Sequence, residues 1–406
     1  MTKHRNITRR DFLQKGAAAA LAAPLFINSR VFGANDRIVM GCIGMGGQGT
    51  GDMGGFMGFG DVQVVAVCDV VDDHCNRAKN RVDGKYGNKD CKAYKDFRDV
   101  VARDDIDVIF IGTPDHWHAI ISIAAMKNGK DVYCEKPETL TVREGREMVK
   151  VARRFGRVFS GGSQRVWGDY NWFHSMIYGG RIGQVQEAWV NVGGPSGPCD
   201  HAHQPTPAGV DWDMWLGPAP WRPFHPGLIR GGFRPFRDYS GGGMTDWGCH
   251  TFGGALFGCN LHRTGPVEII PPDGKDVKNL TYVFENGVKI YHGGGWGGIL
   301  TFKGTEGEIG QGGDRSGKKE SPPNIHIPNY KGHGGIFGDF LHCVRTREKP
   351  FRDIEIAHRT ATHSHLGNIA YWLNRPLKWD PAREEIIGDP EASRWLDRTK
   401  REPWSL

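Results

Sequence analysis

The sequence predicts an α/β fold in which a doubly wound parallel sheet is followed by a second domain built on a mainly antiparallel sheet. Short apolar runs alternate with helical patterns up to about residue 163, which is typical of parallel sheets. After about Arg165, alternating apolar and polar strands replace them. The 406 residues are enough for two such domains. We therefore expect domains at 35–163 and 164–375, with a C-terminal tail, 376–406, packing back on the chain.

In the first domain, apolar runs predict the strands and glycines punctuate them. "RIVMGCIG" (37–44), "VQVVAVCD" (62–69), "DVIFIG" (107–112) and "DVYCEKP" (131–137) read as buried strands, and "RVFSGGSQR" as a further one. Helical patterns lie between them. The last of these opens with Thr141 three residues before Glu144, which is the spacing of a capping box.

In the second domain, "GQVQEAWVNVGG", "NLTYVFENGVKIYHGG" and "GILTFKGTEGEIG" alternate as half-buried strands do. The stretch 193–243 is rich in Pro, Gly, Trp and His and has little periodicity. Loops of that length are usually functional. Its tryptophans Trp212, Trp215 and Trp221 suit either sugar stacking or the covering of a core.

The N-terminus resembles a twin-arginine export signal. Arg9 and Arg10 precede the short apolar run "GAAAALAAPLFI", and small residues follow near 31–34. We expect residues 1–34 to be this signal and the protein to be periplasmic or otherwise exported. The alternative is an N-terminal amphipathic helix. The apolar run is too short for a convincing membrane span.

Composition excludes several other classes of protein. The net charge of +6 is modest and spread along the chain, so we expect no nucleic-acid partner. The nine cysteines show no paired or metal-ligand spacing, which argues against a disulfide framework. His201 and His203 lack a third ligand nearby, so we expect no metal site. His358, His363 and His365 lie on a predicted helix and read as structural.

The glycine-rich segment after the first strand indicates a dinucleotide site. Gly44, Gly46 and Gly49 have G-x-G-x-x-G spacing, and Asp69 ends the next strand 20 residues after Gly49. The glycines permit a tight turn, backbone approach to a pyrophosphate and close helix–strand packing. Asp69 would accept hydrogen bonds from ribose hydroxyls and repel a 2′-phosphate, which favours NAD over NADP. The alternative is a glycine-rich turn beside a surface Asp.

The ends of the next two strands carry further polar residues. Ligands of open α/β sheets bind beyond the carboxyl ends of strands. Thr113 and Pro114 are therefore expected along the cofactor, with His116 and His118 close by, although each His could equally cap or pack a helix. Lys136 ends the fourth strand and would point into the same crevice, where an ammonium can bind a substrate hydroxyl.

"GGGMTDWGCHTFGG" (241–254) supplies a carboxylate and an imidazole. If this segment is helical, Asp246 and His250 lie one turn apart on the same face. The pair could serve as acid and base or as two ligands of a metal. A helix-start Asp beside a packed His is the structural alternative.

Taken in order, "GCIGMGGQG", "TPDHWH", "EKP" and "GGGMTDWGCH" resemble the Gfo/Idh/MocA family of glucose–fructose oxidoreductases and inositol dehydrogenases. The resemblance covers nearly the whole chain after the signal. It implies a Rossmann domain, a C-terminal α/β domain with an open sheet face that often mediates assembly, NAD(P), and a sugar or polyol substrate. We therefore expect a homo-oligomer formed through that face. One departure is "HTFGGALF", because many relatives carry an Asp shortly after the catalytic His.

The resemblance also implies the site. His250 would accept the proton of a substrate hydroxyl while hydride leaves, Lys136 would orient that hydroxyl, and Asp246 would fix the sugar or the histidine. His118 joins these three as a substrate contact. The expected cofactor contacts are Gly44, Met45, Gly46, Gly49, Asp69, Thr113, Pro114, His116, His118, Glu135 and Lys136.

Three activities fit these residues. The first is an NAD(P)-dependent oxidoreductase that takes hydride from a secondary hydroxyl of a sugar or glycoside to a tightly bound nicotinamide. The second is an NAD-dependent glycosidase that works by transient oxidation, elimination, hydration and re-reduction, with no net redox change. The third, a non-catalytic glycan-binding protein, agrees least with an intact Lys136, Asp246 and His250.

Overall fold

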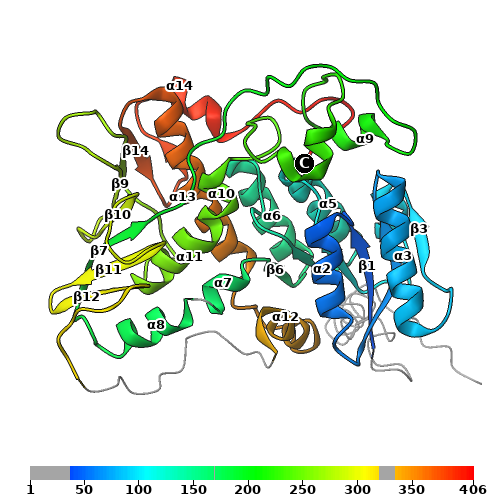
Figure 1. Cartoon of the computed structure of the whole chain (residues 1–406), viewed down its shortest axis with the longest axis horizontal. Coiled ribbons are helices and arrows are strands. Elements are labelled where there is room, and N and C mark those ends of the chain that lie inside the picture. The colour runs from blue at the N-terminus through cyan, green and yellow to red at the C-terminus, as the bar shows by residue number, and fades with distance from the viewer. Residues whose placement is uncertain (1–36, 169, 320–333) are drawn as a thin grey trace, which may run out of the picture. The chain divides into compact units, whose positions relative to one another are not determined.

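The computed structural model describes residues 37–168, 170–319 and 334–406. The expected export signal, residues 1–34, lies outside the described residues. Residues 39–406 form one compact unit, which contains both sheets (Figure 1).

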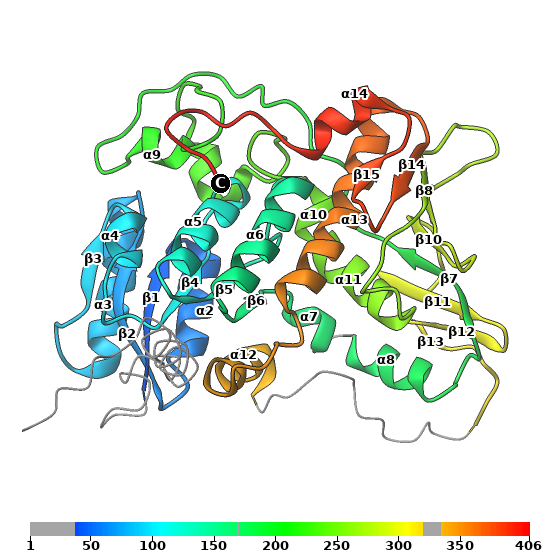
Figure 2. The same ribbon diagram turned by 180° about the vertical axis from the view of Figure 1, so that it is seen from behind.

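The N-terminal half of this unit is a six-stranded sheet in the order β3-β2-β1-β4-β5-β6. The pairings β1–β4, β2–β3, β4–β5 and β5–β6 are parallel. Helices α2 and α3 lie on one face, and α5 and α6 lie on the other (Figures 1 and 2). The strands are β1 (Ile38–Ile43), β2 (Val62–Cys68), β3 (Lys92–Tyr94), β4 (Val108–Ile111), β5 (Asp131–Cys134) and β6 (Phe159–Gly161). The helices are α2 (Gly47–Phe56), α3 (Asp72–Tyr86), α4 (Phe97–Val101), α5 (Asp115–Lys127) and α6 (Val142–Arg154).

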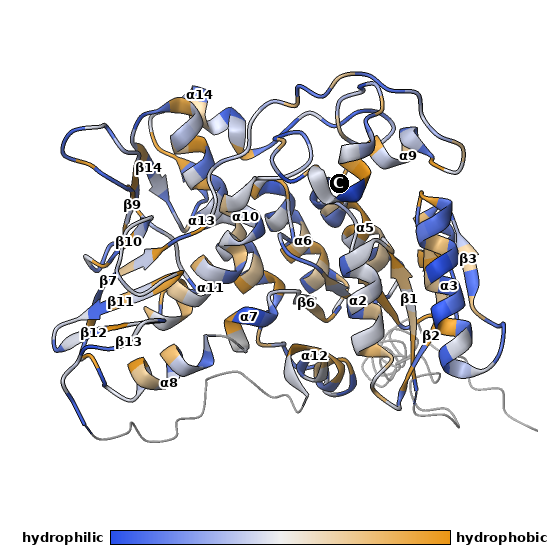
Figure 3. Ribbon diagram, in the orientation of Figure 1, coloured by the Kyte–Doolittle hydropathy of each residue, from blue (hydrophilic) through white to orange (hydrophobic). Residues whose placement is uncertain are grey.

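The predicted doubly wound sheet is confirmed. β4 and β5 are buried along their whole length, as continuous apolar runs in parallel sheets are. β1 and β2 are coloured mainly hydrophobic and most of α3 hydrophilic (Figure 3). The predicted capping box is also present, because the Glu144 amide donates to the Thr141 hydroxyl and the Glu144 carboxylate accepts from the Thr141 amide.

The second sheet has nine strands in the order β13-β12-β11-β7-β10-β9-β8-β14-β15. It is mainly antiparallel, as predicted, but β7 and β10 are parallel neighbours. Its strands are β7 (Val185–Val190), β8 (Glu268–Ile270), β9 (Leu280–Val283), β10 (Lys289–His292), β11 (Leu300–Gly304), β12 (Gly307–Gly310), β13 (Gly313–Asp314), β14 (Leu377–Asp380) and β15 (Glu385–Ile386). The expected tail begins as a strand of this sheet, because β14 pairs with β8.

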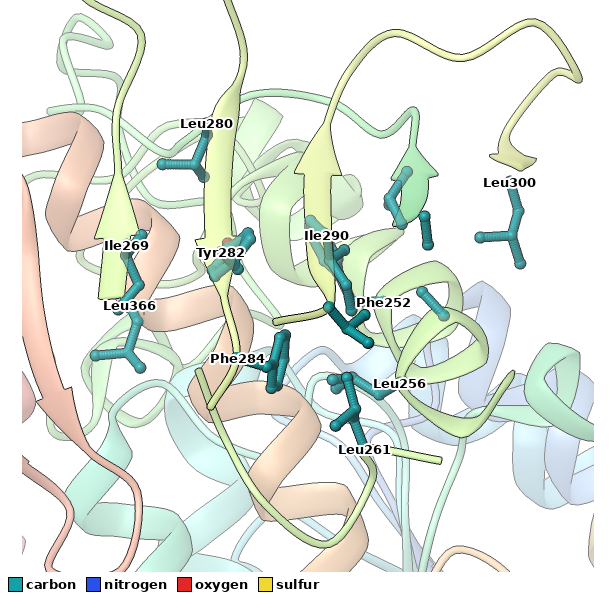
Figure 4. Close-up of a cluster of buried hydrophobic side chains, with 14 of the residues drawn as sticks. Phe252, Leu256, Leu261, Ile269, Leu280, Tyr282, Phe284, Ile290, Leu300 and Leu366 are labelled. Atoms are coloured by element: carbon teal, nitrogen blue, oxygen red, sulfur yellow. The ribbon is translucent and has the colours of Figure 1, made fainter. Parts of the chain in front are cut away.

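One face of the second sheet is packed against helices and the other is partly exposed. Phe252 and Leu256 of α11 meet apolar side chains from the strands, such as Tyr282 and Ile290 (Figure 4). The helices of this half are α7 (Gln164–Trp167), α8 (Asn171–Tyr178), α9 (Trp212–Leu216), the π-helix η2 (Leu228–Gly232), α10 (Gly243–Asp246), α11 (Gly248–Gly258), α12 (Gly335–Thr346), α13 (Ile354–Leu373), α14 (Pro390–Ser393) and the 3₁₀ turn η3 (Arg394–Leu396).

The long aperiodic stretch is folded. It contains α9 and η2 and carries its own apolar cluster, in which Trp212 and Trp215 stack with ring centroids 4.7 Å apart. These two tryptophans therefore cover a core, and Trp221 is 66% exposed. α9 lies beyond the carboxyl ends of the first sheet's strands, close to α5 and to the C-terminus (Figures 1 and 2).

No helix among residues 37–168, 170–319 and 334–406 combines the length and apolar character needed to cross a bilayer.

Candidate active site

The glycine-rich turn joins β1 to α2 and requires glycine at two positions. Gly44 has φ +84°, and a Cβ there would lie 2.4 Å from the Thr113 amide nitrogen. A Cβ on Gly49 would lie 1.9 Å from the Gly44 carbonyl oxygen. These two glycines let strand, turn and helix approach one another, which is the packing role expected of the first and third glycines.

Gly46 has a different role, because it faces open space. A Cβ built on Gly46 or Gly47 meets no atom within 4 Å, and both residues line a cavity of about 330 Å³. α2 starts at Gly47, and none of the described side chains caps its N-terminus. The backbone N–H groups of its first turn therefore lack intrahelical partners and favour a negative charge. This cradle, which a Cβ would fill, fits the pyrophosphate of a dinucleotide.

Asp69 lies on the wall of the same cavity. One of its carboxylate oxygens accepts from the Met45 amide at 2.6 Å and the other accepts from the Val71 amide at 2.8 Å. These bonds fix the carboxylate beside the glycine-rich turn and leave lone pairs on both oxygens. A ribose diol can donate to them, whereas a 2′-phosphate would meet a like charge. The residues present therefore fit NAD.

Six of the expected cofactor residues line this cavity: Gly44, Gly46, Gly49, Asp69, Thr113 and Pro114. The other five, Met45, His116, His118, Glu135 and Lys136, do not. Met45 contributes through the amide that holds Asp69. Glu135 is buried. This burial, and secondly the negative charge of the nearby Asp52, raise the pKa of its carboxyl well above the usual value.

His116 and His118 are buried in the protein rather than exposed to the cavity. His116 Nε2 donates to the Trp215 carbonyl at 2.9 Å. His118 lies between the carbonyls of Pro137, at 2.7 Å, and Thr113, at 2.8 Å. Burial lowers the pKa of each ring to about 4, although the carbonyl contacts oppose this. His118 thus connects the end of β4 to the turn after Lys136, and the geometry supports positioning rather than ligand contact.

Lys136 and Asp246 form the charged centre of the site. Lys136 Nζ lies 2.6 Å from Asp246 Oδ1, and Arg234 Nε lies 3.2 Å from the same oxygen. Burial disfavours the ammonium, but the carboxylates of Asp246 and Glu135 outweigh it and raise the pKa of Lys136. Burial likewise opposes ionisation of Asp246, but the cations of Lys136 and Arg234 lower its pKa. Both partners are therefore charged near neutral pH.

His250 is neutral and oriented. Burial, and then the positive charges of Lys136, Arg165 and Arg352, lower the pKa of its ring well below the usual value. His250 Nδ1 lies 2.9 Å from Ser163 Oγ, and the Ser163 hydroxyl donates to the Cys249 carbonyl at 3.2 Å. Because the Ser163 hydroxyl proton is already donated to the Cys249 carbonyl, the Nδ1–H of His250 must donate to Ser163 Oγ. Nε2 is left with its lone pair, and no described protein atom hydrogen-bonds to it.

The structure brings Lys136, Asp246 and His250 together, but not as one helical face. Asp246 ends α10 and His250 lies in α11, and the two short helices meet at Trp247. Asp246 bonds to Lys136 rather than to the imidazole, and Ser163 orients the histidine instead.

Four residues near this centre were not identified from the sequence. Ser163 follows the last predicted strand of the first domain and Arg234 lies in the aperiodic stretch, and only the fold brings them to His250 and Asp246. Trp247 is 41% exposed beside the pair, with the Arg165 guanidinium 4.7 Å from its ring centroid. Asp115, at the start of α5, is buried, and burial raises its pKa to about 7.

Two family models match this chain. The NAD-binding Rossmann fold of the Gfo/Idh/MocA oxidoreductase family matches residues 38–163, and that family's C-terminal α/β domain matches residues 193–406. A glycosyl hydrolase family 109 protein from Saccharopolyspora erythraea is 35% identical over 130 residues, 31% of this chain and 28% of the relative. An alpha-N-acetylgalactosaminidase from Shewanella oneidensis is 31% identical over 178 residues, 37% of this chain and 38% of the relative.

The chain thus matches about a third of the length of these curated relatives. Among solved structures, the WlbA dehydrogenase from Bordetella pertussis, in complex with NADH and UDP-GlcNAcA, has a similar fold, with a TM-score of 0.60 at 17% identity. That match covers 85% of this chain and 98% of the other. The structure provides a dinucleotide cradle and a Lys–Asp–His centre, and both domain models match the chain in order. The chain therefore belongs to the Gfo/Idh/MocA oxidoreductase family and carries its NAD-binding Rossmann domain.

Proposed function

We propose that this protein oxidises a secondary hydroxyl of a sugar or glycoside with NAD. The observation that carries the proposal is a neutral His250, whose Nε2 has no hydrogen-bond partner among the described residues, beside the charged Lys136–Asp246 pair. A base of this kind can take a hydroxyl proton, and a fixed ammonium can hold the same hydroxyl oxygen. NAD, when bound, supplies the hydride acceptor.

Each polar group of the site has a separate task. Lys136 donates to the substrate oxygen and stabilises negative charge that develops on it as the proton leaves. His250 Nε2 accepts that proton, and Ser163 keeps the ring in the required tautomer. Asp246 keeps Lys136 protonated and in place. Trp247 offers an exposed indole on which the apolar face of a sugar ring can pack.

The second candidate is the redox-neutral glycosidase. It is favoured by the likeness to glycosyl hydrolase family 109 proteins, one of which carries the name alpha-N-acetylgalactosaminidase. A transient carbonyl acidifies the neighbouring C–H, so a base in this site could remove that proton and expel the aglycone. Hydration and re-reduction then give the free sugar without net consumption of NAD.

Product mass spectrometry distinguishes these activities. Purified protein is incubated with a panel of p-nitrophenyl glycosides, with and without added NAD. An intact glycoside two hydrogens lighter, formed together with NADH, identifies the dehydrogenase. Free sugar and aglycone without net NADH identify the glycosidase. Unchanged glycosides throughout the panel would contradict both.

Two variants test the residue assignments. Lys136→Met and His250→Gln should lose roughly 100-fold or more in turnover, the size typical of a lost acid–base group, while retaining the wild-type circular dichroism. Lys89→Met and His203→Gln are matched controls at exposed positions. Wild-type turnover in both site variants would refute the catalytic assignment.

We further propose that the protein is exported by the twin-arginine route, which the Arg9–Arg10 pair and the following apolar run support. Fusion of residues 1–34 to a folded reporter should send the reporter to the periplasm. Replacement of both arginines by lysine should retain it in the cytoplasm, and unchanged export would contradict the proposal.

We also propose that the protein forms a homo-oligomer through the partly exposed face of the second sheet. On this face Trp189 and Tyr291 stack with ring centroids 5.5 Å apart, and both are only partly buried. Trp189→Glu should reduce the mass measured by sedimentation to that of a monomer. A wild-type mass of one chain would refute the proposal.

A further inference from the structure

The dinucleotide cavity has two walls that come from different parts of the chain. One wall is the expected one, made by the glycine-rich turn, Asp69 and the end of β4. The other comes from the second half of the sequence and includes Trp215, Ile229 and Phe233. These residues belong to a stretch, 209–234, that we call the cover segment.

The cover segment is attached to the first domain immediately after Asp69. Val71 and Val210 form an antiparallel bridge. The Asp72 amide donates to the Gly209 carbonyl at 2.8 Å, and the Asp211 amide donates to the Val70 carbonyl at 2.9 Å. The start of the cover is thus held at the carboxyl end of β2, next to the residue expected to bind the adenine ribose.

A second attachment joins the cover to α5. His116 Nε2 donates to the Trp215 carbonyl at 2.9 Å, and the Trp117 indole N–H lies 3.1 Å from the same oxygen. Gly217 fits against the Trp117 ring so closely that a Cβ would lie 2.0 Å from it. This gives the buried His116 and Trp117 of "TPDHWH" a role, because both hold the second wall in place.

The C-terminal residues close the cover from outside. The Arg401 guanidinium donates to the Gly217 carbonyl and the Asp213 carbonyl, at 2.9 Å each, and pairs with the Asp213 carboxylate. The Trp404 ring packs edge-on against Trp117, with centroids 4.6 Å apart. The end of the chain lies beside α9 and α5 in Figures 1 and 2.

The cover also brings positive charge to the cavity. Arg230 and Arg234 both line it. These two arginines line the same cavity as the first turn of α2, although Arg234 is also paired with Asp246. A pyrophosphate is doubly negative, so both walls attract it.

We propose that the cover segment, anchored by His116, Trp117 and Arg401, encloses the bound dinucleotide and sets the rate at which it is released. A cofactor that contacts both attached walls must break its contacts with each before it leaves, so loosening the cover should speed its release. The inference rests on NAD binding by this cavity, not on the identity of the sugar.

The test measures release directly, in full-length protein and without any sugar. Protein loaded with NADH is mixed with a large excess of NAD, and the decay of NADH fluorescence gives the release rate. Arg401→Ala should release NADH at least tenfold faster than wild type. Asp213→Ala removes one of the partners of Arg401. Because the Asp213 side chain is 77% exposed, the variant should fold normally, and it should accelerate NADH release by a smaller factor than Arg401→Ala.

Arg383→Ala is the matched control, because this arginine is 73% exposed and pairs with Glu385 in β15. It should release NADH at the wild-type rate. Wild-type release rates for both Arg401→Ala and Asp213→Ala would overturn the proposal, as would equal acceleration by Arg383→Ala. NADH release from wild type within the mixing time would also overturn it, because an enclosing wall must retain its ligand. Sugar turnover is measured separately, so a failure of the proposed reaction does not alter this result.

Discussion

Gly46→Ala should abolish tight NAD binding without harming the fold. Gly46 has φ −64° and ψ −167°, which alanine adopts without strain, and its new methyl group would meet no protein atom within 4 Å. Replacing glycine by alanine at such a position stabilises a protein by about 0.4–1 kcal/mol, because the unfolded chain loses freedom. The methyl group would, however, occupy the space in which the pyrophosphate approaches the N–H groups of α2.

The expected loss can be estimated from hydrogen bonds to a charged group, which contribute about 1.5–3 kcal/mol each. Losing one such bond to the pyrophosphate should raise the Kd for NADH roughly 10- to 100-fold. NADH titration followed by fluorescence gives Kd, and urea unfolding of the cofactor-free protein gives its stability.

Alanine substitutions at two other glycines of the same turn and helix serve as controls for Gly46→Ala. Gly51→Ala lies on the exposed side of the same helix, with no atom within 4 Å, and should leave Kd unchanged. Gly44→Ala places a Cβ 2.4 Å from a backbone nitrogen at φ +84°, so it should lower the free energy of unfolding by at least about 1–2 kcal/mol. If Gly46→Ala binds NADH as tightly as wild type, the cradle is not the pyrophosphate site.

Three further predictions concern selectivity, substrate and pH. Asp69→Asn removes the charge that opposes a 2′-phosphate and should raise the NADP-to-NAD affinity ratio by roughly tenfold, about 1.4 kcal/mol; an unchanged ratio from the two titrations would contradict the assignment. Trp247→Ala should raise KM several-fold with little change in kcat, whereas Trp221→Ala, at an exposed position outside the site, should change neither; equal effects of the two would exclude a sugar contact. Burial raises the pKa of Asp115 to about 7, so the folded protein holds a proton that the unfolded chain loses near pH 4. Ionisation of Asp115 therefore lowers the stability by up to a few kcal/mol as the pH rises from about 4 to 7, whereas the buried histidines, whose pKa values are lowered, act in the opposite direction. Asp115→Asn should gain stability relative to wild type between pH 5 and pH 8 in urea unfolding, and an unchanged difference between the two proteins would contradict this role.

The first sheet was predictable because its strands are short continuous apolar runs that lead directly into glycine or acidic residues. The exception was β3, whose three residues, Lys92–Tyr94, are at most partly buried and give no apolar run. The strands β8, β13 and β15 are similarly short, and their pairing in the sheet rather than their composition makes them strands. The local sequence pattern therefore reveals a strand only when the strand buries enough side chains to require an apolar run.

The site was predictable only in part, for a related reason. Lys136, Asp246 and His250 stand out because charged groups near a strand end or a glycine-rich helix start are unusual. Ser163 gives no such signal, because its importance lies in a hydrogen bond to a residue 87 positions away. For His116 the sequence left two roles open, a cofactor contact or a packed helix residue, and in the structure its ring donates to the Trp215 carbonyl.

The electrostatics and the cover segment together bear on which reaction this site performs. A charged Lys136–Asp246 pair next to a neutral imidazole can move a proton off a hydroxyl and also return it, because neither partner must change its own charge state permanently. A dinucleotide retained by the cover segment, as proposed above, would exchange slowly with a pool of free cofactor after each turnover. Such an enzyme works best when each catalytic cycle restores its own cofactor. The redox-neutral glycosidase restores its cofactor in every cycle, and the proposed dehydrogenase does so when it reduces a second sugar in the same site. Under either alternative, purified protein already loaded with NAD should cleave or interconvert its substrate for many turnovers with no cofactor added.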